Sequence, residues 1–257
     1  MATGLLGCAM RSFLIWLGFC CASFARADEP KCPLAGHQFA WGDEFDGDKV
    51  DVARWDYRTG VRFWSEQRPE NVSLRAGRLV IAGRKEKTAK VGYTAGGVIS
   101  KQLFRYGYYE ARFKVPPGAG WHTSFWMMRN GWRNVEADQH VQEIDVCEND
   151  SVRQDEYSVN SHQWLPKPHK AFGGKKVKTP SLSADFHVWG CEFTAQTLKY
   201  YFDGKLVHQA DATVLKHGDQ HVWLTMIASP LGGTKAVDDA KLPAEAEYDY
   251  VRVFTRK

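Results

Sequence analysis

Apolar and polar residues alternate along most of the chain in short runs that Gly, Pro, Asn and Asp separate. A two-residue period places neighbouring side chains on opposite faces of an extended segment, so each run predicts a β-strand with one buried face. No stretch shows a long, well-capped helical period. The pattern therefore predicts an all-β sandwich. The predicted strands cover residues 77–83, 96–104, 106–115, 187–194, 198–209, 221–228 and 248–255.

Two segments between these runs are defined by their composition. Asp203-Gly204 separates KYYF from KLVH, and because both residue types accept positive φ, this pair predicts a hairpin with a type I′ turn. Residues 165–180 are rich in Pro, Gly and Lys and predict a long surface loop. Its lysines could meet an anionic substrate, although runs of charge are usually only solvated.

The chain has 257 residues, which suits one large sandwich. Arg11 precedes an apolar run that ends in the triplet Ala25-Arg26-Ala27, which is typical of a secretory signal over residues 1–27. An uncleaved membrane anchor is the alternative, but the run is shorter than the ~20 apolar residues that a spanning helix needs. We therefore expect export to the extracellular space or the periplasm, and a single domain over residues 28–257 with no membrane association after cleavage.

Charge and cysteine content narrow the possible partners. The formal net charge is +4, and loss of Arg11 and Arg26 with the signal would lower it further, so nothing favours nucleic acid. The mature part keeps Cys32, Cys147 and Cys191, an odd number that permits one disulfide at most. We expect a monomer whose fold is stabilised by its hydrophobic core.

Three carboxylates lie in the segment EIDVCEND, residues 143–150. Glu143 and Asp145 share one face of a strand, whereas strict alternation would direct Glu148 into the core. An unpaired charge is unfavourable there. A β-bulge at Val146-Cys147 would insert one extra residue and return Glu148 to the face of the other two.

Carboxylates on one face of a sheet suit the hydrolysis of a glycosidic bond. On a curved sheet the two long Glu side chains could bring their carboxyl groups near the ~5 to 5.5 Å of retaining glycosidases. One carboxylate then attacks the anomeric carbon while the other is protonated, and crowding of like charges raises at least one pKa. Taken alone, however, E-x-D-x-x-E also arises by chance on exposed strands and in loops.

Ordered motifs over nearly the whole mature chain resemble glycoside hydrolase family 16, the secreted endoglycosidases that include laminarinases, lichenases, agarases and carrageenases. The motifs are WGDEFDG, RPENVSLRAGRLVIAGRKE, YGYYEARFKVPPGAGWHTSFWMM, EIDVCE, FHVWGCEFTAQTLKYYFDGKLV and YDYVRVF. The resemblance implies a concanavalin A-like β-jelly-roll sandwich of two antiparallel sheets with an open concave cleft.

The resemblance also implies roles for the carboxylates, because the family pattern E-[I/L/V]-D-x-x-E matches residue by residue. Glu143 is then the nucleophile, Asp145 a helper and Glu148 the general acid/base. The implied reaction is hydrolysis of a β-linked polysaccharide, a β-glucan or a galactan, by double displacement with retention and without a cofactor for catalysis. The alternatives are a non-catalytic, lectin-like carbohydrate-binding sandwich and a transglycosylase that uses the same site.

Sugar rings have apolar faces, so we expect aromatic platforms and polar groups along the cleft. We expect Trp121 to face the cleft, whereas Trp126 could equally belong to the core and Trp223 is expected there. For His162 a structural hydrogen bond is the alternative, and for Asn71 it is an Asx-turn. The candidate substrate-binding residues are Trp121, His122, Trp126, His162, Trp164, Trp64, Asn71 and Arg68.

One motif departs from the family pattern. Laminarinases typically read G-x-W-P-A-F-W before the catalytic strand, whereas this chain reads GWHTSFW, with His122 at the usual Trp position. This difference argues against plain β-1,3-glucan. A polar ring at this position could instead contact a differently shaped sugar such as galactose.

The resemblance implies one structural metal site away from catalysis. Family members frequently bind Ca²⁺, and the comparable positions here are Glu44, Asp249 and the carbonyl oxygen of Gly77. Hard oxygen ligands of this kind suit Ca²⁺. Both acidic residues could equally be ordinary surface charges.

Overall fold

A computed structural model describes residues 29–129 and 140–257, together with Met1. Contacts divide the chain into Met1–Pro30 and Lys31–Lys257, and the fold described below is that of the second unit. Apart from Met1, the predicted signal over residues 1–27 lies outside the described residues. Within the described ranges, no helix has the length and apolar character needed to cross a membrane.

Strands and short 3-10 helices make up the regular structure of the described residues. The strands are β1 (His37–Asp43), β2 (Trp55–Tyr57), β3 (Gly60–Arg62), β4 (Ser65–Gln67), β5 (Val72–Leu74), β6 (Leu79–Lys85), β7 (Tyr93–Ser100), β8 (Gly107–Lys114), β9 (Trp121–Met128), β10 (Val141–Asp150), β11 (Glu156–Leu165), β12 (Lys170–Lys178), β13 (His187–Phe193), β14 (Thr197–Phe202), β15 (Lys205–Asp211), β16 (His221–Ala228) and β17 (Ala244–Arg256). The 3-10 helices are η1 (Pro69–Asn71), η3 (Leu231–Gly233) and η4 (Asp239–Lys241).

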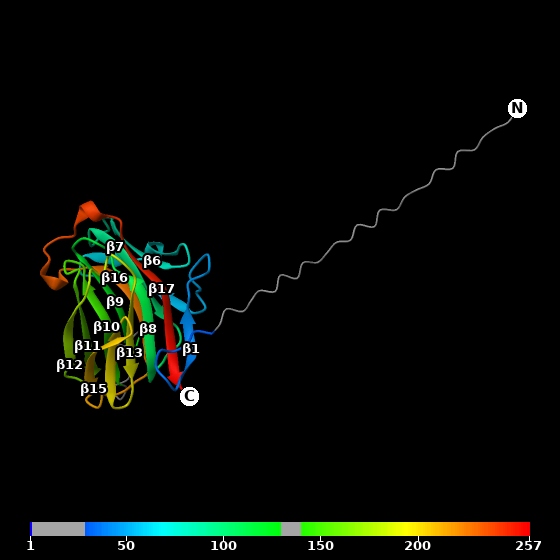
Figure 1. Cartoon of the computed structure of the whole chain (residues 1–257). Coiled ribbons are helices and arrows are strands. Elements are labelled where there is room, and N and C mark those ends of the chain that lie inside the picture. Colours follow the sequence, from blue (N-terminus) through cyan, green and yellow to red (C-terminus); the bar gives the residue numbers. More distant parts are fainter. Residues whose placement is uncertain (2–28, 130–139) are drawn as a thin grey trace. The chain divides into compact units, whose positions relative to one another are not determined.

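The described strands join into one continuous sheet that folds into two mostly antiparallel layers, with β4 parallel to β7 (Figure 1). The first, called here the site sheet, has the order β12-β11-β10-β9-β16-β7-β2. In the second, the back sheet, β1 and β6 pair with β17, which is followed by β8, β13, β14 and β15. Strand β6 also pairs with β7 and so connects the two sheets. The predicted all-β sandwich of two antiparallel sheets is confirmed.

Large aromatic side chains fill the space between the sheets. Phe113 of β8 stacks on Trp189 of β13 with ring centroids 3.9 Å apart and on Tyr248 of β17 at 4.7 Å. All three side chains have no exposed surface. Cores of this kind bury a large apolar area per residue, and the fold therefore depends on packing.

Trp121 belongs to this core, which corrects the prediction that it faces the cleft. Its side chain is 2% exposed, and a Cβ added to Gly83 would lie 2.4 Å from its ring. The two-residue period of β9 explains the error, because Trp126 points outward and residues at odd separation from it point inward. The neighbouring His122, and not Trp121, is on the outward face.

The cysteines of the described residues do not stabilise the fold covalently. Cys32, Cys147 and Cys191 are all free, and Cys147 and Cys191 are buried in the core. Among the described residues, stability therefore comes from packing and hydrogen bonds.

The predicted hairpin is confirmed. Phe202 of β14 pairs with Lys205 of β15, and the two residues between them, Asp203 and Gly204, have φ of 47° and 75°. Two consecutive positive φ values are what a type I′ turn requires, and its twist matches that of the strands.

The predicted loop over residues 165–180 is wrong for its greater part, because Lys170–Lys178 form β12. This strand pairs with β11 only and is the edge of the site sheet. Most of its side chains are exposed, so no alternation marks the sequence as a strand. Lysine on an edge strand is a common protection against pairing with other chains.

We expect Gly83→Ala to destabilise the fold by ~1 to 3 kcal/mol, because the added methyl overlaps the buried Trp121 ring and the core must shift to accept it. Denaturant unfolding measures the loss. Gly92→Ala is the matched control, since a Cβ there meets no atom within 4 Å, and its effect should stay within ~0.5 kcal/mol. Equal stability of the two variants would contradict this packing.

Candidate active site

A β-bulge in β10 places three carboxylates on the outward face of the site sheet. Asp145 pairs with Trp126 of β9, but the next pair along the ladder joins Cys147 to Phe125, so Val146 is the extra residue. Glu148 then pairs with Ser124 and lies on the same face as Asp145. The predicted bulge is confirmed, and it keeps Glu148 out of the core.

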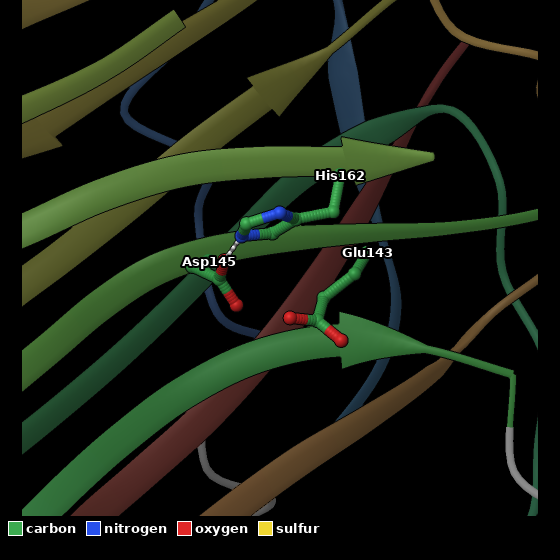
Figure 2. Close-up of side chains that lie close together, drawn as sticks. All are labelled: Glu143, Asp145 and His162. Atoms are coloured by element: carbon green, nitrogen blue, oxygen red, sulfur yellow. Dashed lines mark ion pairs between the residues drawn. The ribbon is translucent and has the colours of Figure 1, made fainter. Parts of the chain in front are cut away.

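Glu143, Asp145 and His162 meet at the centre of this face (Figure 2). Each offers one polar atom within 4.8 Å of the others. His162 of β11 pairs with Glu143 across the ladder, and its Nε2 lies 3.3 Å from Oδ2 of Asp145. His162 therefore contacts the helper carboxylate Asp145.

Trp164 fixes the position of Glu143. Its Nε1 donates a hydrogen bond to Oε2 of Glu143 at 2.9 Å. The Trp164 ring stacks on His169 with centroids 4.0 Å apart and lies parallel to His162 at 5.8 Å. His169 thus covers one face of the Trp164 ring, which was predicted to be a sugar platform. The indole N–H of Trp164 donates its hydrogen bond within the site.

Burial and mutual repulsion shift the titration of the central carboxyls. Burial, with a smaller effect from Asp145, raises the pKa of Glu143 to about 8, although His162 and Trp164 act to lower it. Burial and the charge of Glu148 raise the pKa of Asp145 well above its usual range, although its hydrogen bond with Glu143 acts to lower it. Two full charges are unfavourable in this space, so near neutral pH at least one of the carboxyls of Glu143 and Asp145 is protonated.

Glu148 has a different set of neighbours. Nε2 of His122 lies 3.3 Å from Oε1 of Glu148, and Nδ1 of the same ring lies 2.8 Å from Oδ1 of Asp150. Burial by itself lowers the pKa of His122, but Asp150 and Glu148 together raise it to about 9. The ring is 8% exposed, and both of its nitrogens face carboxylates. Neither nitrogen of His122 is therefore free to bind a sugar hydroxyl, and the predicted contact of this ring with a sugar such as galactose stays a prediction.

A cavity on this face holds the three carboxylates. Trp126 lines it, stacks on Trp223 with centroids 4.5 Å apart and donates a hydrogen bond to Thr225 at 3.0 Å. Trp126 is thus on the cleft side. Trp223, which was expected in the core, pairs with it from β16 on the same face and is 7% exposed. The Arg58 guanidinium lies 5.7 Å from both rings. The lining includes Arg58, Arg62, His122, Trp126, Trp164 and Thr225.

The remaining predicted binding residues lie apart from this cavity. Asn71 is 2% exposed and donates to the carbonyl of Ala82 and to Thr94, which is a structural role. Arg68 pairs with Glu66 and Glu86. These groups surround a separate hollow. Trp64 packs against the hydrophobic core.

Sequence reasoning missed Arg58, Arg62, Asp150 and His169. Only Asp150 carried a signal, because it follows Glu148 by two residues in the same strand and so shares its face. Arg58 and Arg62 come from a distant segment that the fold brings to β10, and His169 lies just after β11 in a stretch with no pattern that marks it.

The predicted calcium ligands already have protein partners. Arg252 donates to both carboxylate oxygens of Glu44, at 2.8 and 2.7 Å, and Arg112 pairs with Asp249 at 2.6 Å. A cation there would have to displace an arginine from each carboxylate. Calcium binding stays a prediction that this pairing does not favour.

Comparisons with known proteins agree with this geometry. The family model described as "Beta-porphyranase A-D, GH16 domain" matches residues 38–256. The chain is 26% identical over 275 residues to a β-glucanase of Rhodothermus marinus, covering 95% of this chain and 93% of that protein. It is 28% identical over 250 residues to β-porphyranase E of Zobellia galactanivorans, covering 84% and 86%. The crystal structure of a laminarinase from Flavobacterium sp. UMI-01 superposes with a TM-score of 0.75, at 23% identity and with 85% and 100% coverage, which shows the shared fold.

We expect Glu143→Gln to stabilise the folded protein at alkaline pH. The carboxyl titrates near 4.5 when unperturbed but at about 8 in the folded protein. Its contribution to stability is therefore complete below the lower value and is lost as the pH rises through the higher one. Gln carries no charge, so the advantage of the variant should grow between pH 5 and pH 8.5, by ~1 kcal/mol or more.

Denaturant unfolding of both proteins at the two pH values tests this expectation. Glu70→Gln, at an exposed position, is the control and should show no such pH dependence. A Glu143→Gln variant that loses stability relative to the wild type as the pH rises would contradict the conclusion that burial raises the pKa of Glu143.

Proposed function

Because the chain belongs to glycoside hydrolase family 16, we propose that it is a secreted, retaining endo-β-glycosidase that cleaves a β-linked galactan of the porphyran type. The observation that carries the proposal is the bulge at Val146, which holds Glu143, Asp145 and Glu148 on one face of a cavity. Secretion is part of the proposal and rests on the sequence of residues 1–27.

In the first step, Glu143 attacks the anomeric carbon of the bound sugar. A covalent ester forms between its carboxylate and that carbon, while the glycosidic C–O bond breaks. Glu148 delivers a proton to the departing oxygen. The hydrogen bond from Trp164 leaves one oxygen of Glu143 free for attack and keeps the carboxylate oriented.

In the second step, water hydrolyses the ester. Glu148, now ionised, removes a proton from the water, whose oxygen bonds to the anomeric carbon as Glu143 departs. Two inversions at the same carbon give net retention. A sugar hydroxyl in place of water would give transglycosylation by the same route.

Asp145 controls the ionisation of the nucleophile. It is 3% exposed, hydrogen-bonds with Glu143 and has a pKa raised well above its usual range. For attack Glu143 must be the carboxylate, and a proton held on Asp145 at that moment removes the repulsion between the two groups. His162 holds Asp145 from the other side, with 3.3 Å between Nε2 and Oδ2.

The lining of the cavity supports an anionic galactan as substrate. The matching family model is that of β-porphyranases, and porphyran carries sulfate esters. Arg58 and Arg62 add positive charge to the cavity. Guanidinium groups bind oxyanions through directed, charge-assisted hydrogen bonds.

We expect Glu143→Gln to lose at least ~10³-fold in kcat, because no other carboxylate can take the place of the nucleophile. The assay measures new reducing ends on porphyran, agarose, carrageenan, laminarin and mixed-linkage glucan. Glu245→Gln, which alters an ion pair on the back sheet, is the matched control. Proton NMR of fresh products should show the β-anomer first.

Each of three results would contradict a part of this function. Products released first as the α-anomer would exclude retention. A folded wild-type protein that binds one of these polysaccharides without cleaving any of them would favour the lectin-like alternative. Cleavage of laminarin alone would reject the galactan.

We expect Arg62→Gln to lower kcat/KM on porphyran by ~10 to 100-fold, the loss of one charge-assisted hydrogen bond. Arg62 is exposed and its guanidinium lies 4.6 Å from the Phe63 ring, so the variant should fold. Desulfated porphyran is the control substrate and should be cut by both proteins at similar rates. An equal loss on both substrates would contradict an anion-binding role.

A further inference from the structure

His122 lies between two carboxylates, of which Glu148 lines the cavity and Asp150 does not. The ring lies between Asp150, 2.8 Å from Nδ1, and Glu148, 3.3 Å from Nε2. Glu148 and His122 line the cavity, and Asp150, together with Glu148, lines an adjacent hollow. The three groups therefore form a continuous array that ends at the acid/base.

The backbone holds this array in place. His122 of β9 pairs with Asp150 of β10, and Ser124 pairs with Glu148, so His122 and Glu148 are diagonal neighbours on one face. Gly232 lies against Asp150, where an added Cβ would come within 2.5 Å of the Asp150 Cβ. Neither end of the ring can turn away easily, because the ring is 8% exposed.

Charged groups face the His122 ring from β10, from the cavity and from the adjacent hollow. Strand β10 presents Glu148, Asp150 and, more distantly, Asp145. Strand β16 presents the apolar Ile227, which pairs with His122. Arg58, Arg62 and Glu143 line the same cavity. Arg153, Glu156 and Lys176 line the adjacent hollow, together with Glu148 and Asp150.

We propose that His122 stores the proton that Glu148 donates to the leaving oxygen and then recovers it. This inference rests on the proposed function. In the resting enzyme His122 is an imidazolium that donates Nδ1–H to Asp150 and Nε2–H to ionised Glu148. His122 acts through Glu148 and is a positioning residue rather than a catalytic one.

The proton balance closes over the two steps. During glycosylation, Nε2 of His122 transfers its proton to Glu148, and Glu148 passes that proton to the leaving oxygen as the glycosidic C–O bond breaks. His122 is then neutral and Glu148 is ionised. During deglycosylation, Glu148 takes a proton from water and Nε2 of His122 is protonated again. The pKa of about 9 for His122 agrees with a charged ring in the resting state.

The arrangement assigns separate tasks to two histidines on either side of β10. His162 contacts the carboxyl that holds the proton next to the nucleophile, while His122 contacts the acid/base. Asp150 keeps His122 charged, in the same way that a buried carboxylate orients and stabilises an imidazolium in other enzymes.

NMR of ¹⁵N-labelled imidazole rings tests the resting state without reference to activity. The signal of His122 is identified by its loss in His122→Gln. We expect both nitrogens to be protonated at pH 7.5, and we expect the pKa of the ring to fall in Asp150→Asn and in Glu148→Gln. A neutral His122 ring in the wild type at this pH would overturn the proposal, whatever the substrate proves to be.

Leaving-group dependence tests the proton transfer. His122→Gln should lose ~10² to 10⁴-fold on an oligosaccharide of the cleaved polysaccharide, whose leaving group needs a proton. It should keep near wild-type glycosylation of the matching dinitrophenyl glycoside, whose leaving group needs none. Asp150→Asn keeps the shape of the site and should move the alkaline limb of kcat/KM to lower pH.

Equal losses of His122→Gln on both substrates, or an unmoved alkaline limb in Asp150→Asn, would show a structural role and overturn the proposal. Failure of the proposed function is distinguishable from this outcome, because in that case the wild type itself would not cleave the polysaccharides.

Discussion

The active-site face depends on one extra residue in β10. Without the bulge at Val146, the period of the strand would direct Glu148 into the core, where an unpaired carboxylate is strongly unfavourable. With it, the apolar side chain of Cys147 takes the inward position instead. A single irregularity in the ladder thus satisfies the core and brings an acid/base to the face that already holds a nucleophile.

Neighbouring strands then give each carboxylate a different partner. Asp145 faces His162 of β11, and Glu148 faces His122 of β9. Glu143 lies beside Asp145 and has a pKa raised to about 8 by burial first and by that neighbour second. Groups of one chemical type acquire separate roles because the environment, and not the residue type, sets their protonation. The repulsion between these neighbouring carboxylates is unfavourable. The site can keep it because the packing of the surrounding sandwich stabilises the fold independently.

The sequence allowed the sandwich and the bulge to be predicted, since a two-residue period and the exclusion of Glu148 from the core leave one simple arrangement. The orientation of Trp121 follows from its odd separation from Trp126, but the sequence left open which face Trp126 itself occupies. The strand within residues 165–180 was not accessible, because an edge strand exposed on most sides shows no alternation. Arg58 reaches the cavity only through tertiary packing, for which no local pattern exists.

Trapping the covalent intermediate tests the central assignment most directly. A 2-deoxy-2-fluoro glycoside of the cleaved galactan oligosaccharide, with an activated leaving group, slows the second step more than the first and allows the glycosyl-enzyme to accumulate. Peptide mass spectrometry should then find one sugar on the peptide that contains Glu143, bound to that side chain. A label on Glu148, or turnover with no covalent species, would contradict the assignment of Glu143 as the nucleophile of a retaining enzyme.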